Sequence, residues 1–460
     1  MSDIQDVDLL VVGGGKAGKS LAMDRAKAGW NVVMVERDKI GGTCINVACI
    51  PTKALVGSAR TLLTARDAAQ MGVVVDGEPK ISLELLRHHK ESVVGGMVTA
   101  HEKLFADSGM EFLLGVARFV DQRTVQVKTR DGATRVVRGR DVVVNTGTTP
   151  AMPDLPGVAE SGVWNSETIL ELRRLPERLL ILGGGYVGCE FASMFETFGS
   201  QVILLQGPDQ LLPREDADIA GAVTELLTSQ GVDVRLGVRA TEVRRDPVTG
   251  EVEVLLDDGS SVRGEELLAA TGRSPVTPQL GLDATGVRVD DRGFVTVDDH
   301  LRTSAEHVWA AGDVAGSPQF THASWNDFRI LKVNLTGGDA VTTGRLVPYS
   351  VFITPELARV GLSEREAREQ GRRIEVAKIA ANAIPREKTL HDDVGVWKAV
   401  VDADTREILG AALLGRNAGE VVAAVQMAML GGLTYEQVRD AVITHPSMAE
   451  GLNLLFDSLS

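Results

Sequence analysis

Apolar and polar positions along the chain predict two copies of one strand–turn–helix–strand arrangement. Residues 7–12, VDLLVV, are almost continuously apolar, which is typical of a strand buried on both faces of a parallel sheet. A glycine-rich turn, a helix rich in small residues and a second apolar strand ending at Glu36 follow. Residues 175–206 repeat this order and end at Gln206. The pattern therefore predicts an α/β fold with an internal repeat.

Both copies carry the turn Gly-x-Gly-x-x-Gly between the first strand and the helix. Glycines there allow a tight turn and let a pyrophosphate approach the helix N-terminus. An acidic residue about 20 positions further on is typical of ribose binding. Glu36 follows the last glycine of its turn by 18 residues, and Gln206 does the same in the second copy. The chain is therefore predicted to bind two dinucleotides, at Gly13, Gly15 and Gly18 and at Gly183, Gly185 and Gly188.

Each copy then continues through a hairpin signal to a strand that ends in Thr-Gly. These strands are DVVVNTG, with Thr146, and ELLAATG, with Thr271. The first copy is longer than the second by about 45 residues between its first glycine and this threonine. Two closely spaced cysteines, Cys44 and Cys49, and the stretch after them at 52–115, which is predicted to be helical, make up this insertion.

Composition and charge indicate a soluble globular protein. The chain has 460 residues, enough for roughly two to four domains, and its formal charge of −15 argues against nucleic acid or an anionic membrane as main partner. The opening MSDIQDVD is acidic where a secretion signal is basic, and no run of about 18 apolar residues occurs. We therefore expect a cytoplasmic location, no nucleic-acid partner and no membrane partner.

Two of the three cysteines, Cys44 and Cys49, lie together in the segment GGTCINVACIPTK. Three cysteines cannot make a disulfide framework, and a close pair in a reducing compartment is typical of a catalytic or metal-binding site. No further ligands follow at the short spacing of a zinc site, so no metal site is expected. In an ideal helix the two side chains would point about 140° apart. A disulfide therefore requires Cys44 to lie in a distorted first turn or ahead of the helix, and beside a dinucleotide the pair indicates redox chemistry.

This segment resembles the active-site signature of the class I pyridine nucleotide-disulfide oxidoreductases, the flavoproteins that include dihydrolipoamide dehydrogenase, glutathione reductase and mercuric reductase. The resemblance covers essentially the whole chain, through both glycine turns, VWAAGDVAG at 308–316, VFITPELARVG at 351–361 and the C-terminal THPSMAE. GGGKAGKSLA, LLPRED and NAIPR are most similar to the bacterial branch typified by the reactive-chlorine-resistance flavoprotein, often called mercuric-reductase-like.

The resemblance implies a glutathione reductase-like fold, in which two Rossmann-like dinucleotide-binding domains precede an α+β dimerisation domain. The implied domains are an FAD-binding domain at 1–148, an NAD(P)-binding domain at 149–275, a central FAD-binding segment at 276–345 and an interface domain at 346–460.

The resemblance also implies roles for the residues around the cysteines. Cys44 matches the thiol that exchanges with substrate, and Cys49 matches the thiol that contacts the flavin. Lys53 and Glu190 match an ion pair beside the flavin ring, and Tyr186 matches the aromatic gate over the nicotinamide pocket.

A C-terminal pair completes the implied catalytic set. His445 and Glu450 match a pair in which the glutamate orients the imidazole as acid and base. In the family this pair reaches the disulfide of the other subunit, so the resemblance implies a homodimer.

The implied cofactors are FAD and either NADPH or NADH. The residues expected to bind FAD are Gly13, Gly15, Gly18, Glu36, Gly42, Thr43, Lys53, Thr146, Gly147 and Asp313. Those expected to bind the nicotinamide coenzyme are Gly183, Gly185, Tyr186, Gly188, Gln206 and Gly272.

The sequence departs from the family at three places. Ala48 replaces a glycine before the second cysteine. Gln206 stands where NADH-using relatives carry an acid, and no arginine or lysine follows before Arg214, so the coenzyme preference stays open with a lean to NADPH. The sequence starts without a metal-binding domain and ends in LLFDSLS without a cysteine pair, so we expect neither mercuric reduction of the usual kind nor the C-terminal relay of thioredoxin reductases.

We therefore expect an NAD(P)H-dependent flavoprotein disulfide reductase with a role in oxidative stress. Electrons would pass from NAD(P)H through FAD to the Cys44–Cys49 disulfide, and from there to a small disulfide or a thiol-reactive oxidant such as hypothiocyanous acid. The alternatives are a reductase of Cu(II) or Hg(II), a dihydrolipoamide dehydrogenase, and a non-catalytic flavin redox sensor.

Overall fold

The computed structural model describes residues 4–392 and 394–459, which divide into two compact units. Each unit is assembled from three separate segments of the chain. The first contains the described residues up to Ala54 together with Arg87–Pro150 and Arg273–Arg345, and the second contains Leu55–Leu86, Ala151–Gly272 and the described residues from Leu346 onward.

A six-stranded sheet forms the centre of the first unit. β1 pairs in parallel with β2 and β5, β2 pairs in parallel with β3, and β3, β4 and β5 form an antiparallel ribbon. β16 extends the sheet beside β5. The strands are β1 (Ile4–Val12), β2 (Val32–Glu36), β3 (Glu111–Phe119), β4 (Thr124–Thr129), β5 (Thr134–Val144) and β16 (Val308–Ala310).

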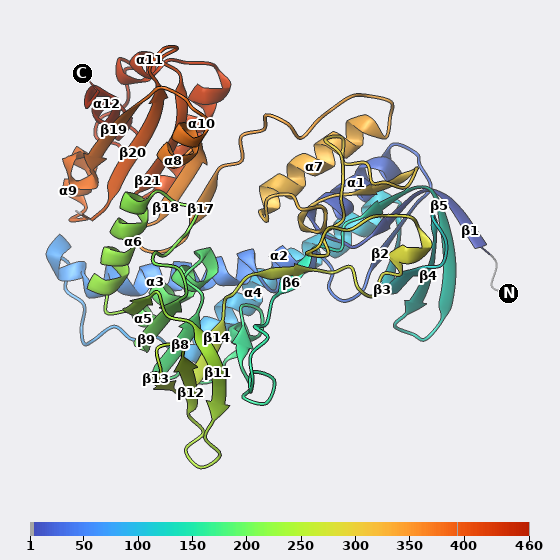
Figure 1. The fold of residues 1–460 in the computed structure, drawn as a ribbon, viewed down its shortest axis with the longest axis horizontal. Helices are drawn as coiled ribbons and strands as arrows, with labels where there is room; N and C mark the ends of the chain where they lie inside the picture. The colour runs from blue at the N-terminus through green and yellow to red at the C-terminus, as the bar shows by residue number, and fades with distance from the viewer. Residues whose placement is uncertain (1–3, 393, 460) are drawn as a thin grey trace. The chain divides into compact units, whose positions relative to one another are not determined.

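Both faces of this sheet are covered, which explains the continuous apolar run in β1. Leu9 and Val11 pack into a core with α1 (Lys16–Lys27) and α7 (Thr321–Asn334), which lie side by side (Figure 1). Leu10 and Val12 point to the opposite face and join a second core. Because successive side chains of a strand alternate between faces, a strand inside two cores has no polar side.

The redox segment and the predicted helical insertion lie between β2 and β3. They form three helices and one turn of 3₁₀ helix, which confirms the helical prediction as far as Ser108, whereas residues 111–115 of the predicted stretch belong to strand β3. These elements are α2 (Gly42–Asn46), α3 (Cys49–Arg66), η1 (Ala68–Met71) and α4 (Leu83–Ser108).

The second unit contains a parallel five-stranded sheet in the order β10-β9-β8-β14-β7, and beside it an antiparallel sheet in the order β11-β12-β13. The parallel strands are β7 (Trp164–Asn165), β8 (Arg178–Leu182), β9 (Gln201–Gln206), β10 (Asp233–Leu236) and β14 (Glu266–Ala269). The antiparallel strands are β11 (Ala240–Arg245), β12 (Val252–Leu256) and β13 (Ser261–Gly264), and the helices are α5 (Tyr186–Phe198) and α6 (Ala217–Ser229).

The C-terminal part of the second unit is an antiparallel sheet covered by helices (Figure 1). Trp397 and Phe456 are fully buried in its core. The strands, in sheet order, are β17 (Tyr349–Val351), β18 (Leu357–Gly361), β21 (Ile408–Leu414), β20 (Val396–Asp402) and β19 (Ile374–Ala380). The helices are α8 (Glu364–Glu369), α9 (Pro385–Thr389), α10 (Ala418–Leu430), α11 (Tyr435–Arg439) and α12 (Gly451–Asp457).

Short elements complete the structure. In the first unit, β6 (Thr148–Pro150) pairs antiparallel with β15 (Arg273–Pro275). The remaining 3₁₀ turns are η2 (Thr168–Glu171), η3 (Leu282–Ala284), η4 (Asp313–Ala315) and η5 (Ala381–Ala383).

The predicted fold class is confirmed: each glycine turn joins a strand of a mainly parallel sheet to a helix, and an α+β segment ends the chain. No helix in the part of the chain that the structure describes is both long and apolar enough to cross a membrane.

Candidate functional site

The first glycine turn, between β1 and α1, has no room for side chains. Gly13 has φ 103°, and a Cβ there would lie 2.3 Å from the carbonyl oxygen of Asn145. A Cβ on Gly18 would lie 2.5 Å from the Gly13 carbonyl oxygen, and the Gly18 N–H donates to Asn145 Oδ1 at 2.8 Å. Gly15 caps α1. Asn145, which the sequence analysis did not single out, therefore holds this turn from the end of the neighbouring strand.

Glu36 lies at the end of β2 against the same turn. Its Oε2 accepts a hydrogen bond from the Gly14 N–H at 2.8 Å, and its Oε1 accepts one from the Asp38 N–H at 2.9 Å. Both bonds hold the carboxylate in place beside the turn. A carboxylate in this position accepts hydrogen bonds from ribose hydroxyls.

A second carboxylate, Asp313, follows β16. Its Oδ2 accepts a hydrogen bond from the Thr148 hydroxyl at 2.7 Å, and Arg273 Nε donates to that hydroxyl oxygen at 2.7 Å. Burial raises the pKa of Asp313. Thr148 follows Thr146 and Gly147, and Gly147 has φ 67°.

Asp327, on α7, is a residue that the sequence analysis missed. It is fully buried, and its Oδ2 accepts hydrogen bonds from the Gly312 N–H at 2.7 Å and the Ser317 hydroxyl at 2.8 Å. Arg345 Nη1 donates to its Oδ1 at 2.5 Å. Because Gly312 directly precedes Asp313, Asp327 fixes the loop that carries the second carboxylate. The available signal was an acidic residue among the apolar positions of a helix that is largely buried.

The redox segment packs against the first glycine turn. Gly42 has φ 73°, and a Cβ there would lie 3.0 Å from the Gly14 carbonyl oxygen. Thr43, next in the chain, is exposed. A glycine cradle, a carboxylate at the ribose position and the buried Asp313 together fit an FAD molecule.

Cys44 and Cys49 lie on separate helices, α2 and α3, as a disulfide between them requires. Both are free thiols and are hydrogen-bonded to each other. Cys49 Sγ also lies 3.4 Å from the Thr321 hydroxyl oxygen. The bond from Cys44, the Thr321 hydroxyl and the charge of Lys53 lower the pKa of Cys49 to about 6, against the opposing effect of burial. The same thiol–thiol bond, together with burial, raises the pKa of Cys44. The pair therefore holds its negative charge on Cys49.

Lys19 is a buried cation near the pair and was not singled out in the sequence. Only 3% of the residue is exposed, and its Nζ donates to the Gly41 carbonyl oxygen at 2.8 Å. Burial and the charge of Lys16 lower the pKa of Lys19 to about 8. Lys19 therefore ties α1 to the turn that precedes the cysteines.

The second glycine turn repeats the geometry of the first. Gly183 has φ 106°, and a Cβ there would lie 2.5 Å from the Ala270 carbonyl oxygen. A Cβ on Gly188 would lie 1.8 Å from the Gly183 carbonyl oxygen, and Gly185 caps α5. Gly272, with φ 128°, follows the strand that supports this turn.

Gln206 takes the place in the second turn that Glu36 takes in the first. Its Oε1 accepts a hydrogen bond from the Gly184 N–H at 2.8 Å, and the separation along the chain is 22 residues in both pairs. Its Nε2 donates to the Gln210 carbonyl oxygen at 3.1 Å. The predicted equivalence of Gln206 and Glu36 is thus confirmed in the geometry of the two turns.

Tyr186 lies at the start of α5 and stacks against Tyr349 of β17. The two ring centroids are 5.1 Å apart at an interplanar angle of 36°. The Tyr349 hydroxyl donates to Oε1 of Glu215, which is almost fully buried and lies 3.6 Å from Arg359. Burial raises the pKa of Glu215, and Arg359 and Tyr349 oppose that shift. The buried polar cluster of Tyr349, Glu215 and Arg359 therefore supports Tyr186, the aromatic residue expected to cover the nicotinamide pocket.

Glu190, one turn further along α5, is buried. Its Oε1 accepts a hydrogen bond from the Phe352 N–H at 2.9 Å, which ties α5 to the chain after β17. Lys53 belongs to the first unit and Glu190 to the second, so the expected ion pair between them stays a prediction.

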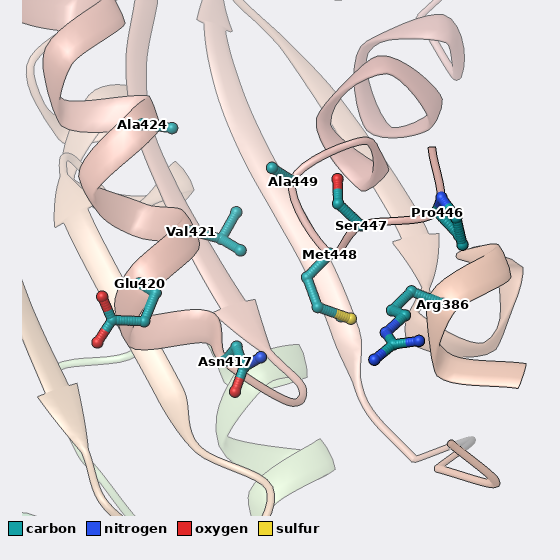
Figure 2. Close-up of a pocket in the computed structure, with 9 residues that line it drawn as sticks. All are labelled: Arg386, Asn417, Glu420, Val421, Ala424, Pro446, Ser447, Met448 and Ala449. Atoms are coloured by element: carbon teal, nitrogen blue, oxygen red, sulfur yellow. The ribbon is translucent and has the colours of Figure 1, made fainter. Parts of the chain in front are cut away.

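His445 and Glu450 are brought together as the sequence predicted. His445 Nδ1 and Glu450 Oε2 are 2.8 Å apart, and the side chains are 70% and 11% exposed, respectively. A cavity of about 570 Å³ lies along the loop that follows His445 (Figure 2). Its lining residues are Arg386, Asn417, Glu420, Val421, Ala424, Pro446, Ser447, Met448 and Ala449.

Cys189 and His322 pack against other parts of the protein. Cys189 is fully buried, and its Sγ lies 3.6 Å from the Gly184 carbonyl oxygen. Burial raises the pKa of Cys189, which is typical of an unreactive structural thiol. His322 stacks on Phe320, with ring centroids 5.4 Å apart.

Comparison with known proteins gives consistent matches along the chain. Residues 7–327 match the family model described as pyridine nucleotide-disulphide oxidoreductase, and residues 347–455 match the dimerisation domain of the same family. The chain is 40% identical over 453 residues to "Probable pyridine nucleotide-disulfide oxidoreductase RclA" of Escherichia coli, covering 97% of this chain and 98% of that protein. It is 34% identical to the mercuric reductase of Streptomyces lividans, covering 97% and 95%. The solved structure titled "Cu(II) complex of HOCl-induced flavoprotein disulfide reductase RclA from Escherichia coli" matches with a TM-score of 0.91 at 38% identity, covering 99% of this chain and 100% of that chain.

Proposed function

Because the chain belongs to the pyridine nucleotide-disulphide oxidoreductases, flavoproteins that use FAD and NAD(P)H, we propose that it reduces a small disulfide or a thiol-reactive oxidant of the hypothiocyanous acid type. Electrons from NAD(P)H reach this acceptor through the Cys44–Cys49 pair. One solved relative is described as HOCl-induced, and this favours an oxidant of the reactive-chlorine group as the acceptor.

The arrangement of Cys44 and Cys49 carries this proposal. FAD, when bound, supplies the two-electron chemistry that links oxidation of the nicotinamide to reduction of the cysteine pair. Thr321 and Lys53 stabilise a thiolate at Cys49, and Cys44 lies at the other end of the thiol–thiol hydrogen bond. One thiol therefore keeps the charge while the other is available for exchange.

With a disulfide acceptor, His445 takes the proton of the Cys44 thiol, and the resulting thiolate attacks one sulfur atom of the acceptor. A mixed disulfide forms, and the other acceptor sulfur leaves with the proton that His445 returns. The Cys49 thiolate then attacks the Cys44 sulfur and restores the Cys44–Cys49 disulfide, and the second acceptor sulfur leaves as a thiolate that takes a proton from the solvent. Two electrons leave the protein in each cycle, and the acceptor gains two electrons and two protons.

Glu450 orients His445 for this proton transfer. The carboxylate oxygen at 2.8 Å fixes the proton on Nδ1 and leaves Nε2 directed away from the glutamate. Residues 347–455 match the family's dimerisation domain, so we infer a homodimer in which each His445 serves the cysteines of the partner subunit.

Reduction of Cu(II) or Hg(II) is the second candidate. Two neighbouring thiolates are soft ligands that suit these ions. The solved Cu(II) complex and the mercuric reductase among the relatives favour this activity, and it would use the same two sulfur atoms.

A panel of acceptors tests the proposal. The protein is reduced anaerobically with NADPH or NADH and then mixed with hypothiocyanous acid, small disulfides, lipoamide, Cu(II) or Hg(II), while flavin absorbance reports reoxidation. We expect hypothiocyanous acid or a small disulfide to reoxidise the wild type and the Cys189→Ala control but not Cys44→Ser. Reoxidation by metal ions alone would favour the second candidate, and failure of every acceptor would favour a redox sensor.

A further inference from the structure

The end of β9, where Gln206 lies, is lined by a segment from a later strand. The Val238 N–H donates to the Gln206 carbonyl oxygen at 3.1 Å, and the Gly237 N–H donates to the Pro208 carbonyl oxygen at 3.1 Å. These bonds continue the pairing of β10 with β9 beyond the last strand residue, Leu236. Residues 237–239 therefore run directly beside residues 206–208.

The side chain of Arg239 lies beside Gly207, the residue that follows Gln206. Gly207 has no side chain, and a Cβ built on it would lie 3.4 Å from Arg239 Cγ, 3.8 Å from Nε and 3.9 Å from Cζ. An arginine 32 positions later in the chain thus lies in van der Waals contact with the side-chain position of residue 207. Because Arg239 lies so far along the chain, the sequence beside Gln206 shows no cation.

The backbone of Arg239 is fixed, while its guanidinium is free. The Arg239 N–H donates to Asp257 Oδ1 at 3.0 Å, and the Asp257 N–H donates to the Arg239 carbonyl oxygen at 2.9 Å. The residue is exposed, and its guanidinium makes no hydrogen bond or ion pair with any residue that the structure describes.

Other arginines on the neighbouring strands are paired. Arg235 lies 2.8 Å from Asp233, and Arg244 lies 2.7 Å from Glu242. The free guanidinium of Arg239 is therefore a local exception, at the end of the strand where the ribose of a dinucleotide lies.

The distribution of charge around Gln206 favours the binding of an anion. Glu36 offers a carboxylate at the equivalent place in the first turn, whereas Gln206 is neutral and both ends of its amide are hydrogen-bonded. The competing charges are Asp209, whose Oδ1 lies 3.2 Å from the position of a Cβ on Gly237, and Asp257, whose Oδ1 accepts a hydrogen bond from the Arg239 N–H at 3.0 Å. A guanidinium binds phosphate with paired hydrogen bonds, and the neutral amide does not repel it.

We propose that Arg239 binds the 2′-phosphate of NADPH and makes this coenzyme the preferred electron donor. The inference rests on the proposed function, since it requires a nicotinamide dinucleotide at the second glycine turn.

Direct binding of two nucleotides that differ only in this phosphate tests the proposal without turnover. Adenosine 2′,5′-bisphosphate and 5′-AMP are titrated into the FAD-loaded protein by calorimetry. We expect the wild type to bind the bisphosphate at least about tenfold more tightly than 5′-AMP, because one charged, paired contact distinguishes them. Arg239→Gln should remove this difference and leave the affinity for 5′-AMP unchanged.

The matched control is Arg235→Gln, which removes a paired arginine four positions away and should keep the wild-type ratio. Equal affinity of the wild type for the two nucleotides, or an undiminished ratio in Arg239→Gln, would overturn the inference. Tighter binding of 5′-AMP would also overturn it and point to Asp209 as a reader of the ribose. If neither nucleotide competes with NADPH or NADH, the second glycine turn does not bind the nicotinamide coenzyme. That result would contradict the proposed function as well as this inference.

Discussion

His445 Nδ1 and Glu450 Oε2 lie 2.8 Å apart, on either side of the turn that begins with Pro446. The glutamate side chain is almost buried, while the imidazole extends into solvent. A buried carboxylate therefore holds an exposed imidazole in one orientation. An imidazole held in this way fits the acid–base role proposed for His445.

Replacing Glu450 with glutamine should impair proton transfer and leave electron entry intact. The amide cannot hold the proton on Nδ1 as the carboxylate does, so we expect kcat/KM for the acceptor to fall about 100-fold, within the usual range for acid–base catalysis. His445→Gln should lower kcat/KM for the acceptor by at least the same factor. Stopped-flow bleaching of the flavin by NAD(P)H is the control and should stay within about twofold of wild type. An unchanged acceptor rate in Glu450→Gln would contradict the assigned role.

The reduced protein should titrate near pH 6 at Cys49. Its pKa is lowered, so the thiolate is present above about pH 6 and becomes protonated as the pH falls through that value. Activity that depends on this thiolate should fall over the same pH range as the thiolate becomes protonated. The ultraviolet absorbance of the thiolate, followed against pH, measures the midpoint.

Thr321 supplies the matched variants for this titration. Thr321→Val removes a hydroxyl near Cys49 Sγ and should raise the midpoint, whereas Thr321→Ser should keep it near the wild-type value. A wild-type midpoint near the ordinary thiol value of about 8.5 would show that the thiolate is not stabilised.

Asp327→Asn should weaken both the fold and the retention of FAD. The aspartate is fully buried and pairs with Arg345, and removal of one charge from a buried pair typically costs about 3–5 kcal/mol. Its bond to the Gly312 N–H places the loop of Asp313, so the ratio of flavin to protein after dialysis should also fall. Urea denaturation gives the stability. Asp339→Asn, at an exposed carboxylate, should match the wild type in both measurements, and full retention of FAD by Asp327→Asn would contradict the positioning role.

Gln206→Glu should shift the coenzyme preference toward NADH. A carboxylate at this position accepts hydrogen bonds from two ribose hydroxyls and repels a 2′-phosphate, and it can no longer donate to the Gln210 carbonyl. We expect the ratio of kcat/KM for NADPH over NADH to fall about tenfold, which corresponds to about 1.4 kcal/mol. Gln210→Glu is the control, because it changes the charge nearby without placing it against the glycine turn. A ratio within about threefold of wild type would mean that other residues read the ribose.

The sequence alone determined the features that depend on short stretches of chain. Gly13 and Gly183 stand where a side chain would collide with the neighbouring strand, so sterics reserve both positions for glycine. The equivalence of Glu36 and Gln206 followed from equal spacing, because a strand–turn–helix–strand unit of fixed length brings the end of its second strand back to the turn. The His445–Glu450 pair needs only one tight turn.

Tertiary structure decided which distant residues support these features. Thr321 reaches Cys49 from 272 positions away, and Asp327 reaches Gly312 from the middle of a helix. Arg239 lies against Gly207 because β10 pairs with β9 in a register set by the packing of the whole sheet. No local pattern encodes such contacts: the free energy that places them comes from burial of cores assembled from separate segments, and each contact forms only after those segments have packed together.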